Sequence, residues 1–405
     1  MSASADPLLA CRPAHVPPDC VVDFDYFHPP GIDQGDDVFT ALGRLHQGPD
    51  IQWTPRNGGH WIATRAEDMR WIRSEPLLFS HKESVVPAGM MQGLMPPTNI
   101  DPPYHARFRA VLNPFFTPGA ISRLEQGVRA ITVELIEGFR PKGECDFVED
   151  FARIMPVVVF LNLLQLPTER RGQFLEWGRG YINAPDNDSK ERAAAEVAAF
   201  LAGVLDEREA SPRGDLFSAI AAWRRNPRFQ SEEEVIGMAM VSFLAGLDTV
   251  TGLLNFTALH LATDAQARAR LVADPGILPQ AVEEYVRRHG LSNSGRLLTA
   301  DVTRKGVTMK QGDMLLVVDA LCSLDERVCP VAKTIDFDRV DGITDTFGNG
   351  VHRCVGEHLA RLELRVFLEE WTKRIPEFRT DPARPPVTYS GVVIGVSQLG
   401  LVWGR

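Results

Sequence analysis

The sequence has no C-x-x-C pair. Its six cysteines are scattered along the chain, at positions 11, 20, 145, 322, 329 and 354. This spacing fits neither a disulfide framework nor a zinc ribbon, so a reducing cytoplasm is the expected location.

The chain also has fewer positively than negatively charged residues. The chain has 43 Lys and Arg residues against 53 Asp and Glu residues, which gives a formal net charge of −10. A protein that binds nucleic acid mainly by neutralising phosphates needs the opposite balance. We therefore expect no nucleic-acid partner.

No hydrophobic run is long enough to cross a bilayer. The most apolar run, residues 235–247, is too short for that, and residues 1–20 combine four prolines with several charges. The N-terminus lacks the apolar core of a signal peptide or an anchor. We expect a protein without membrane attachment.

The composition predicts a single large domain. Of the 405 residues, 44% are hydrophobic, and no linker rich in glycine, serine or one sign of charge divides the chain. We expect one domain over residues 1–405, with residues 1–20 as a mobile N-terminal arm and a monomer in solution.

Local patterns favour a mainly α protein with minor β structure. Asn57-Gly58-Gly59 predicts a hairpin within residues 51–65, and further hairpins are expected within 296–318 and 387–402. Between about residues 101 and 290 helical signals dominate, and Asp101 before two prolines predicts an N-cap.

The most informative helix is predicted over residues 231–264, with Ser231 and Glu234 as a capping box. Apolar residues surround it, but Asp248 and Thr249 interrupt it. In one interpretation Thr249 bonds back to a helix carbonyl and Asp248 pairs with a neighbouring helix. In the other, the two form a proton relay beside a bound group that approaches the backbone at Gly246.

A cysteine directly before a predicted helix is the strongest chemical signal. The chain reads Phe-Gly-Asn-Gly-Val-His-Arg-Cys-Val-Gly over residues 347–356, and a helical pattern begins at Glu357. Backbone N–H groups at a helix start stabilise a thiolate, which predicts a lowered pKa for Cys354 and a metal ligand. A dinucleotide fingerprint is excluded, because Arg353 replaces the third glycine and no βαβ unit follows.

This stretch resembles the haem-ligand signature F-G-x-G-x-H-x-C-x-G of the cytochrome P450 monooxygenases. Other family marks follow in order: residues 284–287 match E-x-x-R, and residues 245–249 match the acid–alcohol pair of the central helix. The similarity extends over residues 22–403. Residues 57–65 and 374–376 are similar to the bacterial camphor hydroxylase branch.

The resemblance implies a triangular P450 fold with a helical lobe and a smaller β lobe. It implies haem b with Cys354 as the iron ligand, Asp248 and Thr249 as the catalytic residues that deliver protons, and an ion pair of Glu284 and Arg287 completed by Arg327. The other residues expected at the cofactor are His105, Arg109, Ala245, Gly246, Arg296, Phe347, Gly348, His352 and Gly356.

The same resemblance places a substrate wall along the loop before Asp101 and along the central helix. Its expected residues are Gly93, Met95, Thr98, Leu244, Ala245, Ser292, Val392 and Val393. A run of methionines in this loop is suited to an adaptable apolar pocket, although such residues also fill cores.

The function implied is insertion of one oxygen atom from O2 into a small hydrophobic substrate, of terpenoid or norisoprenoid type. The chain has no flavin or nicotinamide motif, so electrons are expected from a [2Fe-2S] ferredoxin and its NAD(P)H-dependent reductase. A peroxide-driven or isomerising haem-thiolate enzyme is an alternative. A haem-based sensor or ligand-binding protein is another, but neither has use for an acid–alcohol pair.

Gly93 leads to a prediction about specificity. In the camphor hydroxylase branch a tyrosine at this position donates a hydrogen bond to the substrate carbonyl, and its loss costs about 0.5–1.5 kcal/mol, up to roughly tenfold in affinity. An ionone should therefore compete well with camphor when both are titrated and the low- to high-spin Soret shift is followed. Tight camphor binding with a full spin shift would show that another donor, such as Thr98 or Gln92, takes over this role.

Overall fold

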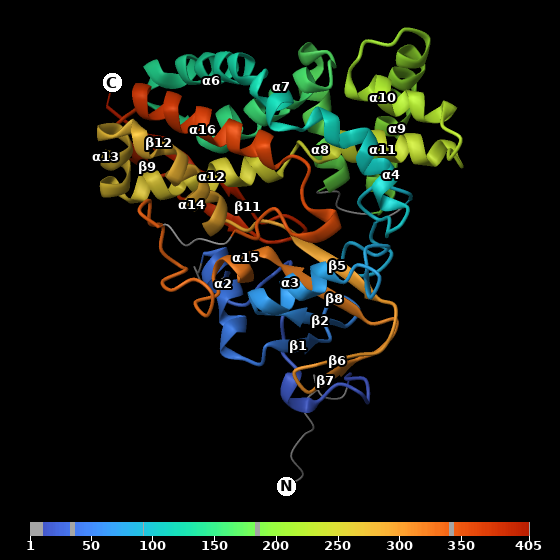
Figure 1. Cartoon of the computed structure of the whole chain (residues 1–405). Coiled ribbons are helices and arrows are strands. Elements are labelled where there is room, and N and C mark those ends of the chain that lie inside the picture. The colour runs from blue at the N-terminus through green and yellow to red at the C-terminus, as the bar shows by residue number, and fades with distance from the viewer. Residues whose placement is uncertain (1–10, 33–36, 92, 183–186, 340–343, 405) are drawn as a thin grey trace.

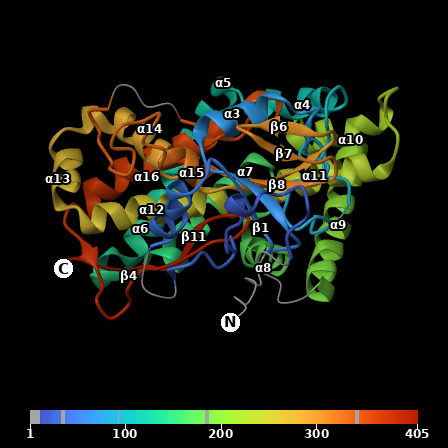
Figure 2. The same ribbon diagram turned by 90° about the horizontal axis from the view of Figure 1, so that it is seen from below.

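The computed structural model describes residues 11–32, 37–91, 93–182, 187–339 and 344–404. Helices fill the wider upper lobe, and a sheet with a few short helices forms the narrower lower lobe (Figure 1). In the view from below, α13 and α10 again lie at opposite ends of the helical lobe (Figure 2). The predicted mainly α fold with a smaller β lobe is confirmed. One catalytic domain over residues 1–405 stays a prediction.

The described helices of the first half are α2 (Val38–Gly43), α3 (Ala66–Ser74), α4 (His105–Leu112), α5 (Pro118–Ser122), α6 (Glu125–Phe139), α7 (Ile154–Leu163), α8 (Arg171–Ile182) and α9 (Asn187–Ala210). They are followed by α10 (Leu216–Ala222), α11 (Glu232–Leu244), α12 (Thr249–Thr263), α13 (Ala265–Ala273), α14 (Leu278–Arg288), α15 (Asp319–Ser323) and α16 (Glu357–Arg374).

The main sheet has the strand order β1-β2-β8-β5-β3. Its strands are β1 (Ile51–Thr54), β2 (His60–Ala63), β3 (Phe79–Ser80), β5 (Asn293–Leu298) and β8 (Met314–Val318). The predicted first hairpin is confirmed: β1 and β2 pair antiparallel, and Asn57, Gly58 and Gly59 all have positive φ angles. β2 pairs with β8 in parallel, which joins the N-terminal hairpin to a strand far along the chain.

The smaller sheets confirm the two later hairpin regions. β6 (Val302–Arg304) pairs with β7 (Val307–Met309), and β10 (Val387–Tyr389) pairs with β11 (Gly395–Gln398). β12 (Gly400–Val402) lies between β4 (Glu144–Asp146) and β9 (Arg379–Thr380).

Part of the N-terminal arm packs on the β lobe. Val16 and Cys20 are buried, and His15 Nε2 lies 2.9 Å from Asp313 Oδ2. The prediction of a mobile arm is therefore wrong for residues 11–20, because apolar side chains anchor them. Residues 1–10 lie outside the described residues.

The predicted central helix is divided into α11 and α12 by a break at residues 245–248. A Cβ on Gly246 would lie 2.3 Å from Cγ of Phe160, so the Phe160 ring occupies the space beside the broken turn. Asp248 leaves helical geometry, with φ −128° and ψ −37°. A single uninterrupted helix was therefore the wrong expectation, because the backbone opens at this point.

The expected capping box at the start of this helix is also wrong. Ser231 makes no side-chain cap, and the buried Glu234 carboxylate instead accepts hydrogen bonds from Arg107 and from Trp223 Nε1, at 2.7 and 2.9 Å. Glu234 is recruited by neighbouring segments because it lies on the buried side of α11.

Within the described chain, one helical stretch, Glu232–Thr263, is long and apolar enough to cross a membrane by length and composition. It comprises α11, the break and α12, and 56% of its apolar window is buried inside the protein. A core helix meets the same criterion, so its packing accounts for its hydropathy.

Asp101 does not cap a helix with its side chain. α4 begins at His105, whose N–H donates to the carbonyl oxygen of Asp101 at 3.1 Å. The Asp101 carboxylate accepts from Ser80 Oγ at 2.5 Å and from the His81 N–H at 2.9 Å. The predicted N-cap is corrected accordingly: Asp101 joins the end of β3 to the start of α4.

The E-x-x-R ion pair is present, but its predicted third member is wrong. Arg287 donates two hydrogen bonds to Glu284, at 2.7 and 2.9 Å, and both side chains are buried. The second arginine at Glu284 is Arg339, whose Nε lies 3.1 Å from Oε1. Arg327 instead donates to Asp50, because its largely exposed side chain extends toward the β lobe.

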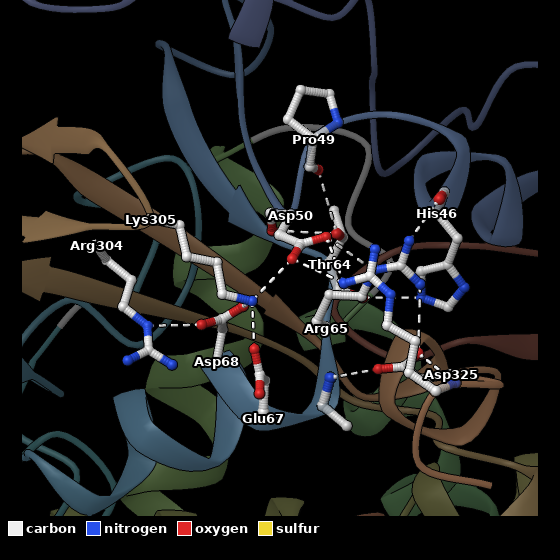
Figure 3. A network of polar contacts seen from close by, with 12 residues as sticks. His46, Pro49, Asp50, Thr64, Arg65, Glu67, Asp68, Arg304, Lys305 and Asp325 are labelled. Carbon is white, nitrogen blue, oxygen red and sulfur yellow. Dashed lines mark hydrogen bonds and ion pairs between the residues drawn. The ribbon is translucent and has the colours of Figure 1, made fainter.

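Asp50 belongs to a polar network in the β lobe (Figure 3). Lys305 Nζ lies 2.8 Å from both Asp50 and Asp68 and also bonds to Glu67. Carboxylate oxygens of these three acids lie within 4.8 Å of one another. Lys305 balances this acidic cluster together with Arg304, which pairs with Asp68, and with Arg65 and Arg327, which pair with Asp50. The network fastens the β6–β7 hairpin to α3.

Candidate active site

The turn before α16 presents Cys354 to an internal cavity. The Cys354 N–H donates to the Phe347 carbonyl at 2.8 Å, which closes the loop over residues 347–354. Gly350 has φ +72°, and a Cβ there would lie 2.5 Å from the carbonyl oxygen of Arg73 on α3. This glycine is therefore required both by its backbone conformation and by the contact with α3.

The predicted lowering of the Cys354 pKa is wrong for the metal-free thiol. Burial raises the pKa of Cys354, and the Gly356 N–H and the Arg109 guanidinium offset this effect only in part. The thiol faces the cavity, not bulk solvent. A cation bound there would favour the thiolate that burial disfavours.

The cavity measures about 290 Å³ and is bordered by residues far apart in the sequence. On the side of the cysteine turn it is lined by Phe347, Gly348, Cys354 and Gly356, and at the break in the central helix by Ala245, Gly246 and Thr249. The remaining walls include Phe116, Phe160, Val250, Leu253, Leu291 and Ser292. One enclosed space thus joins a thiol, an alcohol and an apolar surface.

Several cationic and donor groups at this cavity have no carboxylate partner in the described chain. Arg296 and His352 line it, and the His105 ring lies against that of His352, with centroids 4.3 Å apart. Among the described residues, Arg296 Nε, His105 Nε2 and His352 Nε2 are buried without a hydrogen-bond partner. Arg109 reaches the same turn through its hydrogen bond to the Arg353 carbonyl at 2.9 Å.

Burial disfavours the charged forms of these donors. It lowers the pKa of His105 to about 4, that of His352 to about 3 and that of Arg296 to about 9, and neighbouring cations add to the effect. Unpaired buried donors are costly, and carboxylates would satisfy them. The residues present therefore fit haem b, which carries two propionates and an iron that takes a thiolate.

Asp248 and Thr249 lie at the start of α12. Thr249 faces the cavity, and its hydroxyl makes no hydrogen bond in the described part of the chain. The interpretation that it bonds back to a helix carbonyl is therefore wrong. Burial raises the pKa of the Asp248 carboxyl, and Arg153, beside α7, counteracts this. The charge of Arg153, which directly precedes α7, therefore acts on Asp248, whereas Thr249 makes no bond to a helix carbonyl.

The expected substrate wall is only partly assembled at the cavity. Ala245 and Ser292 line it. Gly93 and Met95 instead line a separate groove against α9 and α11, because Gly237 leaves no Cβ between α11 and the Leu94 carbonyl. Four other expected residues do not line the cavity: Thr98, Leu244, Val392 and Val393.

Sequence reasoning missed several polar residues at the cavity. Arg73 and Asp319 form a buried ion pair there, and Glu363 on α16 also lines it. Burial raises the pKa of Glu363 well above its ordinary value, and its Oε2 has no partner among the described residues. A glutamate on the apolar face of the helix after the cysteine was a usable signal for this residue.

Comparison with known proteins identifies the family. The family model described as Cytochrome P450 matches residues 276–385. The chain is 33% identical over 401 residues to probable cytochrome P450 127A1 of Sinorhizobium fredii (strain NBRC 101917 / NGR234), covering 96% of each protein. It is 31% identical to the mycinamicin IV hydroxylase/epoxidase of Micromonospora griseorubida over 85% of this chain and 89% of that protein.

A solved structure agrees with these sequence matches. The crystal structure of cytochrome P450 CYP101C1 superposes with a TM-score of 0.89 at 34% identity, over 97% of this chain and all of that one. The chain belongs to the cytochrome P450 family. It is a cytochrome P450 monooxygenase, and members of this family bind haem b through a cysteine thiolate.

Proposed function

We propose that Cys354 is the thiolate ligand of the haem and that the cavity above it hydroxylates a small hydrophobic substrate. The observation that carries this proposal is a single cavity lined at once by Cys354, by Thr249 at the helix break, and by the unsatisfied donors Arg296 and His352. When bound, the haem supplies the redox chemistry of O2 activation. His105, Arg109, Arg296 and His352 hold its propionates.

Thr249 and Asp248 control protons in this scheme. The break frees the Thr249 hydroxyl from the helix and directs it into the cavity, where it can donate a hydrogen bond. Asp248 is half-buried, and its raised pKa lets the carboxyl hold a proton more readily than an exposed aspartate does. Asp248 thus passes protons inward from the side of Arg153, and the Thr249 hydroxyl donates them into the cavity.

The substrate is a small apolar molecule of terpenoid or norisoprenoid type. Phe160, Val250, Leu253 and Leu291 give the cavity an apolar wall, and Ser292 is one of its few hydroxyl groups. Shape then decides selection more than directed hydrogen bonds do. The mycinamicin relative is named for a different substrate, so relatives at this identity support the reaction class and not the compound.

Electrons come from a [2Fe-2S] ferredoxin that docks beside the cysteine turn, in the cytoplasm. Arg353 on the cysteine turn and Arg361 on α16 mark this docking face, and both are paired with Glu357. Arg361 also stacks on Phe347, at 4.7 Å from the ring centroid. Arg107 is excluded from this face, because it is nearly buried in its ion pair with Glu234.

Replacing Thr249 tests the proton step. Thr249→Ala should keep the haem, substrate binding and reduction, but divert electrons to peroxide. The reason is that the hydroxyl is needed only for the step in which protons are delivered. Product and peroxide formed per NAD(P)H consumed are measured side by side. Thr251→Ala is the matched control, since the Thr251 hydroxyl bonds to carbonyls of Ala152 and Leu247 at 3.0 and 3.2 Å. Unchanged product per electron in Thr249→Ala would contradict the role.

Salt and charge test the docking face. Electron transfer from an acidic ferredoxin should slow as ionic strength rises. At 0.1 M salt, the attraction between exposed charges is largely screened beyond about 10 Å. Arg353→Gln should raise the KM for ferredoxin on the order of two- to tenfold. Arg56→Gln, which removes an exposed paired arginine from the β lobe, should not change it. Equal effects of both variants, or rates indifferent to salt, would refute the proposal.

A further inference from the structure

His81 is a buried histidine at the cavity to which the fold and the cysteine signature assign no role. It follows β3, is 8% exposed and lines the cavity. Its ring stacks on that of His352, with centroids 3.5 Å apart and planes 13° from parallel. Within the described residues neither ring nitrogen of His81 forms a hydrogen bond, so a donor is left facing the cavity.

The backbone holds His81 in register with α4. The Asp101 carboxylate accepts from the His81 N–H and from Ser80 Oγ, while the Asp101 carbonyl accepts from the His105 N–H. One residue therefore fixes both the strand end that carries His81 and the helix start that carries His105. His352 then lies in contact with both rings.

No residue that the structure describes accepts a hydrogen bond from the His81 ring. Arg296, His352, His105 and Arg73 are its charged or titratable basic neighbours, and together with burial they keep its ring neutral. The nearby acids are already engaged: Asp319 pairs with Arg73, and the Asp101 carboxylate is used by Ser80 and by the His81 backbone. A neutral imidazole still carries one N–H, which needs a partner inside the cavity.

We propose that His81 is a further haem-binding residue, which donates a hydrogen bond to a propionate and whose ring fixes the orientation of His352 by stacking. This inference rests on the proposed haem site at Cys354. It assigns two functions to one side chain, because the N–H meets the carboxylate while the ring face meets His352. A histidine that only filled the core would be replaceable by an aromatic ring of similar size.

The two functions can be separated by substitution in the ferric holoprotein. His81→Phe keeps an aromatic ring against His352 but removes the donor, and His81→Asn keeps a donor but removes the ring. The rate of haem transfer to apomyoglobin and the reduction potential of the haem are measured for each. His60→Phe is the control, because His60 is also buried, has an unpartnered Nε2 and lies in β2, outside the cavity lining.

His81→Phe should release haem faster, on the order of tenfold, as expected for the loss of a hydrogen bond to a charged group. Its reduction potential should become more negative, because an unpaired propionate leaves more negative charge near the iron. His81→Asn should release haem more slowly than His81→Phe, and His60→Phe should match the wild type. Haem loss from His81→Phe at the wild-type rate with an unchanged potential would overturn the inference.

Two further outcomes distinguish a failure of the role of His81 from a failure of the proposed iron ligand. If His81→Phe is recovered only without haem, His81→Leu is compared with His81→Asn, and equal rates of haem loss in this pair would overturn the inference. If the wild-type protein takes up haem but its ferrous carbon monoxide complex lacks the thiolate Soret band, the proposed ligand fails. The proposed function and the role of His81 can thus be refuted separately.

Discussion

The structure depends on one constraint: a thiol and a set of donors must be held inside the protein around a space where some of those donors have no carboxylate partner in the part of the chain that the structure describes. The cysteine turn meets this constraint by fastening Cys354 to Phe347 through a backbone hydrogen bond and by bringing Gly350 against the Arg73 carbonyl of α3. Arg296 Nε and His352 Nε2 have no partner there among the described residues, and a carboxylate-bearing cofactor would supply one. Such a site gives up folding stability in its empty form and recovers it as binding free energy.

The two lobes contribute different parts of the site. The β lobe supplies Arg296 from β5 and His81 after β3, and its network around Lys305 joins α3 to the β6–β7 hairpin. The helical lobe supplies the break between α11 and α12, held open where Phe160 packs on Gly246. Arg339 is the third member of the Glu284–Arg287 ion pair, and this contact stabilises the segment that leads into the cysteine turn. The proposed site therefore lies where the lobes join.

The sequence predicted what depends on local chemistry. Asn57-Gly58-Gly59 was sufficient for the hairpin, and the glycines around Cys354 were sufficient for the turn before α16. It failed where a side chain chooses between distant partners: Arg327 turns to Asp50, and Arg339 takes its expected place at Glu284. The sign of the Cys354 pKa shift was missed for a similar reason, since burial is a property of the whole fold. The sequence around His81 did not indicate a role at the cavity, because that role depends on stacking against the distant His352.

The central claim is that Cys354 binds the haem iron through its thiolate. The most direct measurement is the Soret band of the ferrous carbon monoxide complex in the wild type, in Cys354→Ala, and in Cys145→Ala as a control for loss of a buried cysteine outside the cavity. The wild type and Cys145→Ala should show the red-shifted band of thiolate ligation, and Cys354→Ala should lack it. Retention of that band in Cys354→Ala would contradict the account.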